Sequence, residues 1–166
     1  EHMRRRKPQT TGVAIWQFND CAPAISWSVI DYYGTPKRAY YELARLYSPV
    51  FASFDYPLVP RRAGEIVRGD LWLVNDLLGV FENIVLCAEL NGVEIYARRV
   101  SIQPDSSERI DALAVTLGDN ENILRLIARD DTQVFSDHTY DLNFCDVGEI
   151  GWVDWLMFQI GKRLMR

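Results

Sequence analysis

The middle of the chain alternates apolar and polar side chains with the period of two that is typical of half-buried β-strands. In residues 65–75, Leu71 and Leu73 fall on one face, while Trp72 and Val74 fall on the other. Four similar stretches follow, and they predict further strands over residues 83–90, 93–102, 113–117 and 123–129, with residues 133–144 able to supply a last one.

Turn chemistry separates these stretches and no helical pattern interrupts them. Asn91-Gly92 joins two of them directly, and this pair suits the positive φ angles of a type I′ hairpin. Gly118-Asp119-Asn120 marks a second turn. Short strands at this spacing predict a mainly β fold, an antiparallel β-sandwich of immunoglobulin type, over residues 49–145.

The first 48 residues have a different pattern. Residues 12–18 form a short and nearly continuous apolar run, which predicts a buried strand. Thr35 can cap a helix and Pro36 suits its first position, and apolar side chains then recur at helical spacing as far as Tyr47. Residues 1–48 therefore predict a β/α unit, which cannot cover itself because a parallel strand needs neighbours on both sides.

A third pattern ends the chain. Its apolar side chains fall at helical spacing and its cations lie in the last turn, which predicts a helix over residues 146–166 from Trp152, Trp155, Leu156, Ile160 and Leu164. Such a helix can dock on the protein itself or on a second copy, so a homo-oligomer is possible. A membrane-surface helix is the weaker alternative because the cations gather at one end.

Composition narrows the function classes. The 166 residues carry a formal net charge of −5, which argues against a general nucleic-acid binder, and the basic run 4–7 reads as a solvated loop or helix end rather than a phosphate site. The three cysteines form no CxxC pair and the two histidines lie far apart, so we expect no metal site, cofactor or disulfide framework. No stretch approaches the length of a membrane span and no leader pattern opens the chain, and the compartment stays open.

The densest group of chemically unusual residues follows the predicted first strand. Trp16 can pack its indole face on the C–H groups of a sugar, and Asn19 and Asp20 can bond sugar hydroxyls. The alternative is a core tryptophan followed by a turn, which composition alone favours because tryptophan is usually largely buried.

These residues belong to a longer motif that resembles the last barrel strand and last helix of family 2 glycoside hydrolases of the β-mannosidase type. The motif comprises Gly12, Trp16, Gln17, Asn19, Asp20, Cys21, Pro23, Ser26, Trp27, Asp31, Tyr32, Tyr33, Pro36, Lys37, Tyr40 and Tyr41. Beyond this motif the resemblance is weaker. It depends there on the order of the two parts, a barrel end followed by a sandwich, and on residues 71–76. In that family a (β/α)₈ barrel carries the active site and immunoglobulin-like domains follow it. The family usually has an aromatic residue where this chain has Ala22, which puts the exact sugar in doubt.

The resemblance implies that Trp16 lines the subsite of a β-linked mannoside at the barrel mouth, and that Asn19 and Asp20 shape its rim by touching sugar hydroxyls or bracing loops. The family's retaining hydrolysis needs two glutamates about 5–5.5 Å apart, and both are expected upstream of this segment, with the remainder of the barrel as its partner. Asn120-Glu121 matches the dipeptide that holds the family's acid/base, but it falls in a polar turn. No catalytic residue is therefore expected in this chain.

Three other interpretations stay open. The sandwich can be a carbohydrate-binding module that displays Trp72, Tyr96 or Tyr140, or a purely structural support, and the parent enzyme can be an exo-β-glucosaminidase. If the barrel neighbours are absent, we expect residues 1–35 to be poorly ordered, rearranged on the sandwich or swapped between chains.

Overall fold

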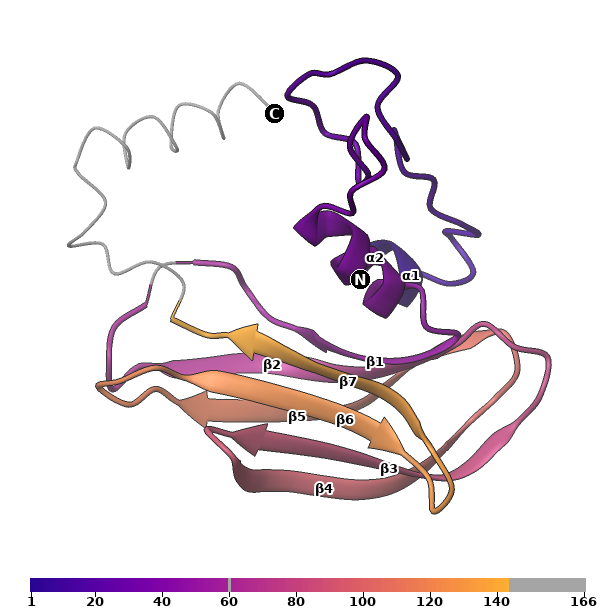
Figure 1. The fold of residues 1–166 in the computed structure, drawn as a ribbon. Helices are drawn as coiled ribbons and strands as arrows, with labels where there is room; N and C mark the ends of the chain where they lie inside the picture. The colour runs from indigo at the N-terminus through magenta and orange to yellow at the C-terminus, as the bar shows by residue number, and fades with distance from the viewer. Residues whose placement is uncertain (60, 144–166) are drawn as a thin grey trace.

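The computed structural model describes residues 1–59 and 61–143. Two helices precede seven strands along the chain (Figure 1): α1 (His2–Arg5), α2 (Arg38–Leu46), β1 (Val50–Asp55), β2 (Ile66–Asn75), β3 (Phe81–Leu90), β4 (Val93–Ile102), β5 (Ser106–Thr116), β6 (Ile123–Arg129) and β7 (Val134–Asp141).

The seven strands form two antiparallel sheets. One sheet has the order β1-β2-β5 and the other has the order β4-β3-β6-β7, so the chain crosses between the sheets after β2, β4 and β5. The sheets stack face to face, and the two helices lie over β1 and β2 (Figure 1). This arrangement confirms the predicted immunoglobulin-like β-sandwich.

The predicted strands are found with small shifts. The predicted bounds of β4 and β6 match the structure, β2 and β3 differ by one or two residues, and β7 is shorter than expected. Asn91 and Gly92 have φ angles of 50° and 80°, as the hairpin turn requires. Two features were not predicted, namely the whole of β1 and the first half of β5.

The core lies between the sheets and is built from the inward side of every strand. Leu86 pairs with Ala128 across the β3–β6 ladder, and both are fully buried. The buried cluster comprises Val50, Ala52, Phe54, Val67, Leu71, Leu73, Ile84, Leu86, Ala88, Ile102, Leu113, Val115, Leu117, Leu124, Leu126, Ala128 and Leu142. Burial of so many branched aliphatic side chains is the main source of the stability of the sandwich.

Side chains of β7 close the seam between the two sheets. β1 is an edge strand, so its outward N–H groups need partners other than a strand. The N–H of Ala52 donates to Ser136 Oγ and the N–H of Phe54 donates to Tyr140 Oη, each over 3.0 Å. These bonds satisfy backbone groups that would otherwise be buried without partners.

The predicted strand over residues 12–18 is wrong. This segment is extended but pairs with no strand, and its side chains are exposed apart from a half-buried Gln17. An apolar run becomes a buried strand only where neighbouring strands cover it, and the described chain supplies none. Residues 8–35 instead extend away from the sandwich, beyond the helices (Figure 1).

The predicted start of the helix that ends near Tyr47 is also wrong, by two residues. Lys37 occupies the N-cap position and α2 begins at Arg38. Pro36 forms a β-bridge with Ile30, which keeps Thr35 and Pro36 in extended backbone and out of the helix.

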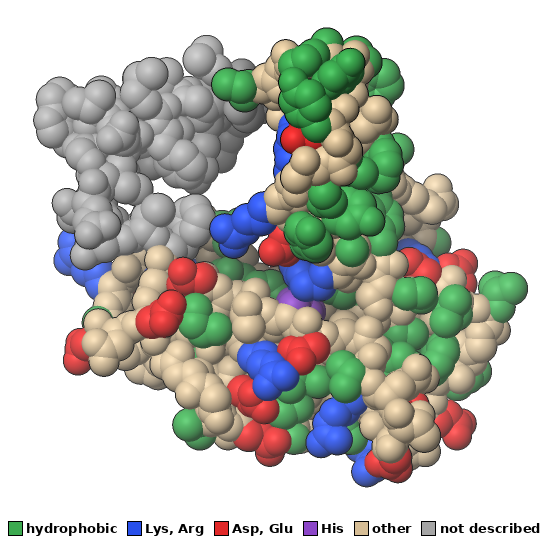
Figure 2. Space-filling view, in the orientation of Figure 1, with side chains coloured by type: hydrophobic (Ala, Val, Ile, Leu, Met, Phe, Trp, Pro, Cys, Tyr) green, Lys and Arg blue, Asp and Glu red, His purple; other side chains and the backbone are tan. Residues whose placement is uncertain are grey.

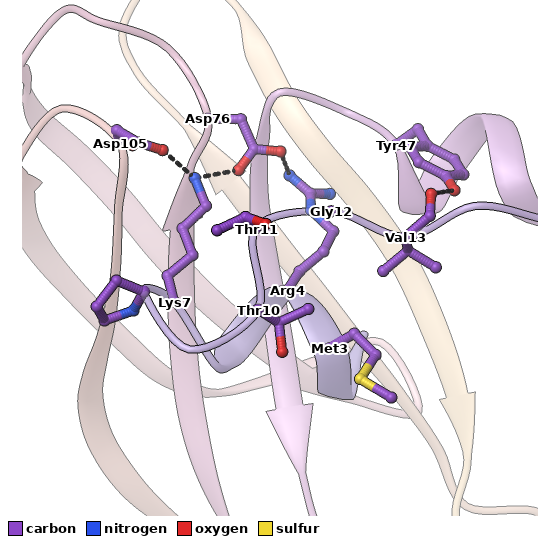
Figure 3. A pocket seen from close by; sticks show the side chains of 11 residues that line it. Met3, Arg4, Lys7, Thr10, Thr11, Gly12, Val13, Tyr47, Asp76 and Asp105 are labelled. Carbon is purple, nitrogen blue, oxygen red and sulfur yellow. Dashed lines mark hydrogen bonds and ion pairs between the residues drawn. The ribbon is translucent and has the colours of Figure 1, made fainter.

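The basic run includes a helix end, as one of the two expectations had it, since Arg4 and Arg5 lie in the last turn of α1. The expectation that the run is solvated is wrong. Arg4 donates to Asp76 over 2.8 Å, and Lys7 Nζ lies 2.6 Å from Asp76 and 2.5 Å from Asp105 (Figure 3). Arg5 pairs with Asp55 over 2.5 Å. A cleft of about 370 Å³ lies beside these ion pairs. These cations attach α1 to β1 and to the loops after β2 and β4. Their charges are therefore paired with aspartates of the protein itself.

Three further observations bear on the sequence-based expectations. The predicted terminal helix 146–166, its proposed oligomer contact and Cys145 lie outside the described residues. Cys21 and Cys87 are free thiols. Within residues 1–59 and 61–143, no helix is long and apolar enough to cross a membrane.

Candidate functional site

The motif residues meet where three short segments run side by side. Asn19 forms a parallel β-bridge with Ile30, and Ile30 forms an antiparallel bridge with Pro36. The N–H of Ile30 donates to the carbonyl of Phe18 over 2.9 Å, and the N–H of Lys37 donates to that of Val29 over the same distance. The chain between them, residues 21–27, is therefore a loop with a closed base.

The carboxylate of Asp20 lies inside this base. Asp20 is 6% exposed, and its Oδ1 accepts a short hydrogen bond from the Ser26 hydroxyl. Its Oδ2 lies 3.2 Å from Lys37 Nζ. The Ser26 hydroxyl, with help from Ser28 and Lys37, outweighs the effect of desolvation and lowers the pKa of Asp20 to about 2. Asp20 is thus an ionised group held by internal partners, so the geometry favours a bracing role over contact with a sugar.

Trp16 and Asn19 lie outside the base. Trp16 is 81% exposed, so the alternative of a core tryptophan is wrong for this structure. The Asn19 side chain is also exposed and donates to the Asp20 carbonyl over 3.3 Å. An exposed indole with an amide nearby offers an apolar face and polar groups, the combination that sugar recognition uses.

Lys37, Ser26 and Ser28 are further members of this cluster, to which sequence reasoning gave no role. Lys37 Nζ donates to Ser28 Oγ over 2.7 Å, and Ser28 Oγ donates to the Ile30 carbonyl over 2.8 Å. The three residues belong to two segments that come together only in the fold. The presence of Ser26 and Lys37 in the family motif was the one available signal, and nothing in the sequence marked Ser28.

The glutamates considered from the sequence lie on the sandwich and on α2. Glu89 and Glu121 border a shallow depression of about 400 Å³, but its lining contains no aromatic side chain and Arg125 pairs with Glu89 over 3.3 Å. Glu94 lies on the same hairpin as Glu89. Glu42 is on α2 and pairs with Arg45 over 3.1 Å. Asn120-Glu121 lies between β5 and β6, in the turn where the sequence placed it.

The sandwich aromatics considered for a binding module are not displayed to solvent. Trp72, Tyr96 and Tyr140 are all partly buried. Tyr140 donates to Glu1 Oε2 over 2.9 Å, and Tyr96 packs against the core. Packing and internal bonds thus account for the burial of Tyr96 and Tyr140. Within residues 1–59 and 61–143, no group of three histidine, cysteine or acidic side chains is placed to hold a metal.

Comparisons with known proteins show similarity to β-mannosidases. No family model matches the sequence. The chain is 37% identical over 71 residues to β-mannosidase B of Aspergillus niger, which covers 40% of this chain and 8% of that protein. It is 29% identical over 111 residues to β-mannosidase B of Aspergillus clavatus, covering 60% of this chain and 13% of that protein.

A solved structure is similar in fold. The β-D-mannosidase of Dictyoglomus thermophilum superposes with a TM-score of 0.65 and 25% sequence identity, over 86% of this chain and 18% of that one. The resemblance seen in the motif is therefore confirmed and fits the C-terminal portion of such proteins. The chain spans 8–13% of the length of these two curated relatives.

Proposed function

We propose that this relative of β-mannosidases forms the C-terminal part of a retaining exo-β-mannosidase-type glycoside hydrolase. Residues 1–48 complete the catalytic barrel and provide the rim of its sugar subsite. The sandwich, residues 49–145, supports that rim from behind.

One observation carries the proposal, the large apolar surface of the first 48 residues. Eleven large apolar side chains of this segment are exposed: Met3, Val13, Ile15, Trp16, Phe18, Ile25, Trp27, Tyr32, Tyr33, Tyr41 and Tyr47. In Figure 2 the green side chains gather over this segment, while charged side chains are spread over the sandwich. A contiguous apolar surface of this kind marks an interface. Similarity to β-mannosidases supports the remainder of a catalytic barrel as the partner of this surface.

Within this proposal the three predicted site residues have different tasks. Trp16 presents its indole face to the terminal sugar at the carboxyl end of the last barrel strand. Asn19 bonds a sugar hydroxyl or the neighbouring loop. Asp20 keeps the loop 21–27 in place, because its carboxylate is already satisfied by Ser26 and Lys37.

The catalytic carboxylates belong to the upstream part of the barrel in this proposal. Retaining hydrolysis needs one glutamate as nucleophile and one as acid/base, about 5–5.5 Å apart. Of the glutamates considered from the sequence, Glu42 lies on α2, and Glu89, Glu94 and Glu121 lie on the sandwich. The substrate is accordingly a β-linked mannoside bound mainly by the upstream barrel.

The test compares the 166-residue chain with the protein encoded by the complete reading frame around it. We expect the complete protein to hydrolyse p-nitrophenyl β-mannoside and the 166-residue chain to show no turnover. In the complete protein, Trp16→Ala should raise KM about tenfold or more, because the sugar loses its apolar wall. Tyr33→Ala is the matched control, as another exposed aromatic of the same segment outside the proposed rim.

Three results would contradict the proposal. Turnover by the 166-residue chain would show that it carries its own catalytic pair. A complete protein that is inactive on β-mannosides but active on β-glucosaminides would support the exo-β-glucosaminidase alternative. Equal KM values for the Trp16→Ala and wild-type proteins would remove Trp16 from the sugar subsite.

A further inference from the structure

We infer that Lys37 is a positioning residue for the sugar-facing rim: its ammonium group fixes the loop 21–27 and links it through α2 to the sandwich. This inference rests on the proposed function for the sugar subsite, but the contacts of Lys37 stand independently of it. Lys37 touches no sugar in this account.

The Lys37 ammonium group contacts the chain on both sides of the loop 21–27. Nζ lies 3.2 Å from Asp20 Oδ2, 2.7 Å from Ser28 Oγ and 3.3 Å from the carbonyl of Ser26. These oxygens come from both ends of the loop 21–27. An ammonium group has three donors, so all three contacts are made by one group.

The loop has few other constraints. Among the described residues, no hydrogen bond joins residues 21–25 to the rest of the chain. Ile25 at its tip is fully exposed and Trp27 is 72% exposed. The conformation of the loop is therefore determined at its base, where Asp20, Ser26 and Ser28 meet Lys37.

Lys37 also balances the negative charge of Asp20. Within residues 1–59 and 61–143, Lys37 is the only cation within ion-pair distance of Asp20. The Asp20 side chain is 4% exposed and that of Lys37 is 31% exposed, so removal of the ammonium leaves a buried carboxylate without its counter-charge, which is destabilising. Without Lys37, the Asp20 carboxylate would draw in water, and the base of the loop would open.

Lys37 is also the N-cap residue of α2. Its backbone N–H donates to the Val29 carbonyl over 2.9 Å, at the residue where α2 begins. The other end of α2 is fixed to the sandwich region, since Arg4 donates to the Leu46 carbonyl and Ser48 Oγ donates to the Phe135 carbonyl over 2.8 Å. α2 is thus a rigid connection between the base of the rim and the sandwich.

The experiment compares Lys37→Met, Lys37→Arg and the control Lys7→Met. Lys7 is also a lysine paired with aspartates, but on the sandwich side, and it is distant from the loop in the chain. In the 166-residue chain, indole N–H signals of Trp16 and Trp27 are assigned by single Trp→Phe substitutions and followed by NMR. Lys37→Met should shift or broaden both signals, Lys37→Arg should largely preserve them, and Lys7→Met should leave them unchanged.

The same variants are then measured as the complete enzyme, with active sites counted by a covalent 2-fluoro-mannoside inhibitor. Lys37→Met should raise KM per active site about tenfold while kcat falls by less than about threefold, the signature of lost binding without lost chemistry. Lys37→Arg should recover much of this loss, and Lys7→Met should change KM by less than about twofold.

Each contrary outcome has a distinct meaning. Indole signals of Lys37→Met that match the wild type would overturn the positioning role whatever the enzyme does. Loss of rate explained wholly by fewer active sites would show that Lys37 supports folding alone, and would equally overturn it. An inactive wild-type enzyme together with shifted indole signals would contradict the proposed function, while supporting Lys37 as the residue that fixes the loop.

Discussion

The sandwich and the first 48 residues are ordered by different forces. The sandwich holds one continuous cluster of seventeen buried apolar residues. In residues 1–48 the only buried apolar side chain is Val29, and the other buried residues there are Asp20 and Ser28. The sandwich is therefore held by apolar burial, whereas the first 48 residues are held by hydrogen bonds and ion pairs. A region with its own apolar core can stay folded by itself. A region held mainly by hydrogen bonds and ion pairs depends on the surface that covers it.

Truncation of a core leucine should have the largest effect on the free energy of unfolding. It tests whether apolar burial holds the sandwich together. Leu126 on β6 is fully buried in the core cluster. Leu126→Ala removes apolar contacts and leaves a cavity, so we expect the free energy of unfolding to fall by ~2–5 kcal/mol. Urea denaturation followed by circular dichroism measures this change.

The matched control is the same kind of change in the first 48 residues. Ile25 is fully exposed, so Ile25→Ala should change the free energy of unfolding by less than ~0.5 kcal/mol. Similar losses for the two variants would show that the loop has a core of its own, and the comparison would be wrong.

The second prediction probes the boundary between the two regions through pH. The ring of His138 stacks on Phe51 with centroids 5.0 Å apart, and Nε2 lies 2.7 Å from Tyr140 Oη. Burial, together with the nearby Arg45 of α2, lowers the pKa of His138 to about 3, and Asp137 opposes this only in part. The imidazole is therefore neutral in the folded protein at any pH well above 3.

The sign of the effect follows from proton binding. In the unfolded chain His138 has a pKa near 6.5, so below that pH the unfolded state binds a proton that the folded state does not. The stabilisation is fully present above pH 6.5 and is lost as the pH falls towards 3. It changes by about 1.4 kcal/mol per pH unit, or ~3 kcal/mol between pH 6.5 and 4.

The measurement is a set of denaturation curves between pH 7 and pH 4 for the wild type and for His138→Gln. The variant should be less stable at pH 7 but should lose less stability on acidification, because it has no proton to bind at this site. The carboxylates contribute equally to both proteins. Parallel pH profiles would mean that His138 is not held neutral under the N-terminal helices.

The third prediction concerns close packing within the sandwich. A Cβ added at Gly69 of β2 would lie 2.5 Å from the Asp55 carbonyl oxygen and 2.7 Å from the ring of Phe54. Gly69→Ala should therefore cost ~1–3 kcal/mol, since backbone and a buried ring cannot both move away. Gly79→Ala is the control, because no atom lies within 4 Å of the added carbon. If both variants have wild-type melting temperatures, β1 and β2 are less tightly packed than the structure indicates.

The same contrast explains which elements the sequence could predict. Strands with one face in the core alternate apolar and polar side chains, and β2, β3, β4 and β6 were found within one or two residues. β1 escaped because all its residues from Val50 to Phe54 are buried, so it has no polar face. Its outward side is covered by the N-terminal helices, where Arg4 lies over the ring of Phe51 and Arg5 donates to Ser53 Oγ. The pattern of apolar and polar residues within a strand cannot reveal that a segment distant in the sequence covers its outward face.

The candidate site was predictable only in part for the same reason. The motif indicated Trp16, and the structure leaves that indole exposed, while its contact with a sugar stays a prediction. The burial of Asp20 could not be predicted, because its partners Ser26 and Lys37 reach it through backbone bridges at Ile30. The absence of a strand over residues 12–18 has a similar origin, since apolar composition predicts burial without supplying the neighbours that cause it.

The smallest effect should come from weakening one bond between the two regions. Asp105→Asn removes the charge that lies 2.5 Å from Lys7 Nζ, and asparagine suits the φ angle of 43° at this position. Asp105 is largely exposed and Lys7 keeps its pair with Asp76, so the loss should be ~0.2–1 kcal/mol and should shrink at high salt. Hydrogen exchange should then quicken in residues 2–7 and stay unchanged in β3 and β6.

Asp119→Asn provides the control for net charge, because Asp119 lies in the turn after β5 and makes no ion pair within the described residues. Faster exchange in the control as well would assign the effect to overall charge. Faster exchange in β3 or β6 after Asp105→Asn would mean that the sandwich unfolds together with the N-terminal helices. The two regions would then be one cooperative unit, and the sandwich would need its N-terminal cover as much as that segment needs the barrel proposed as its partner.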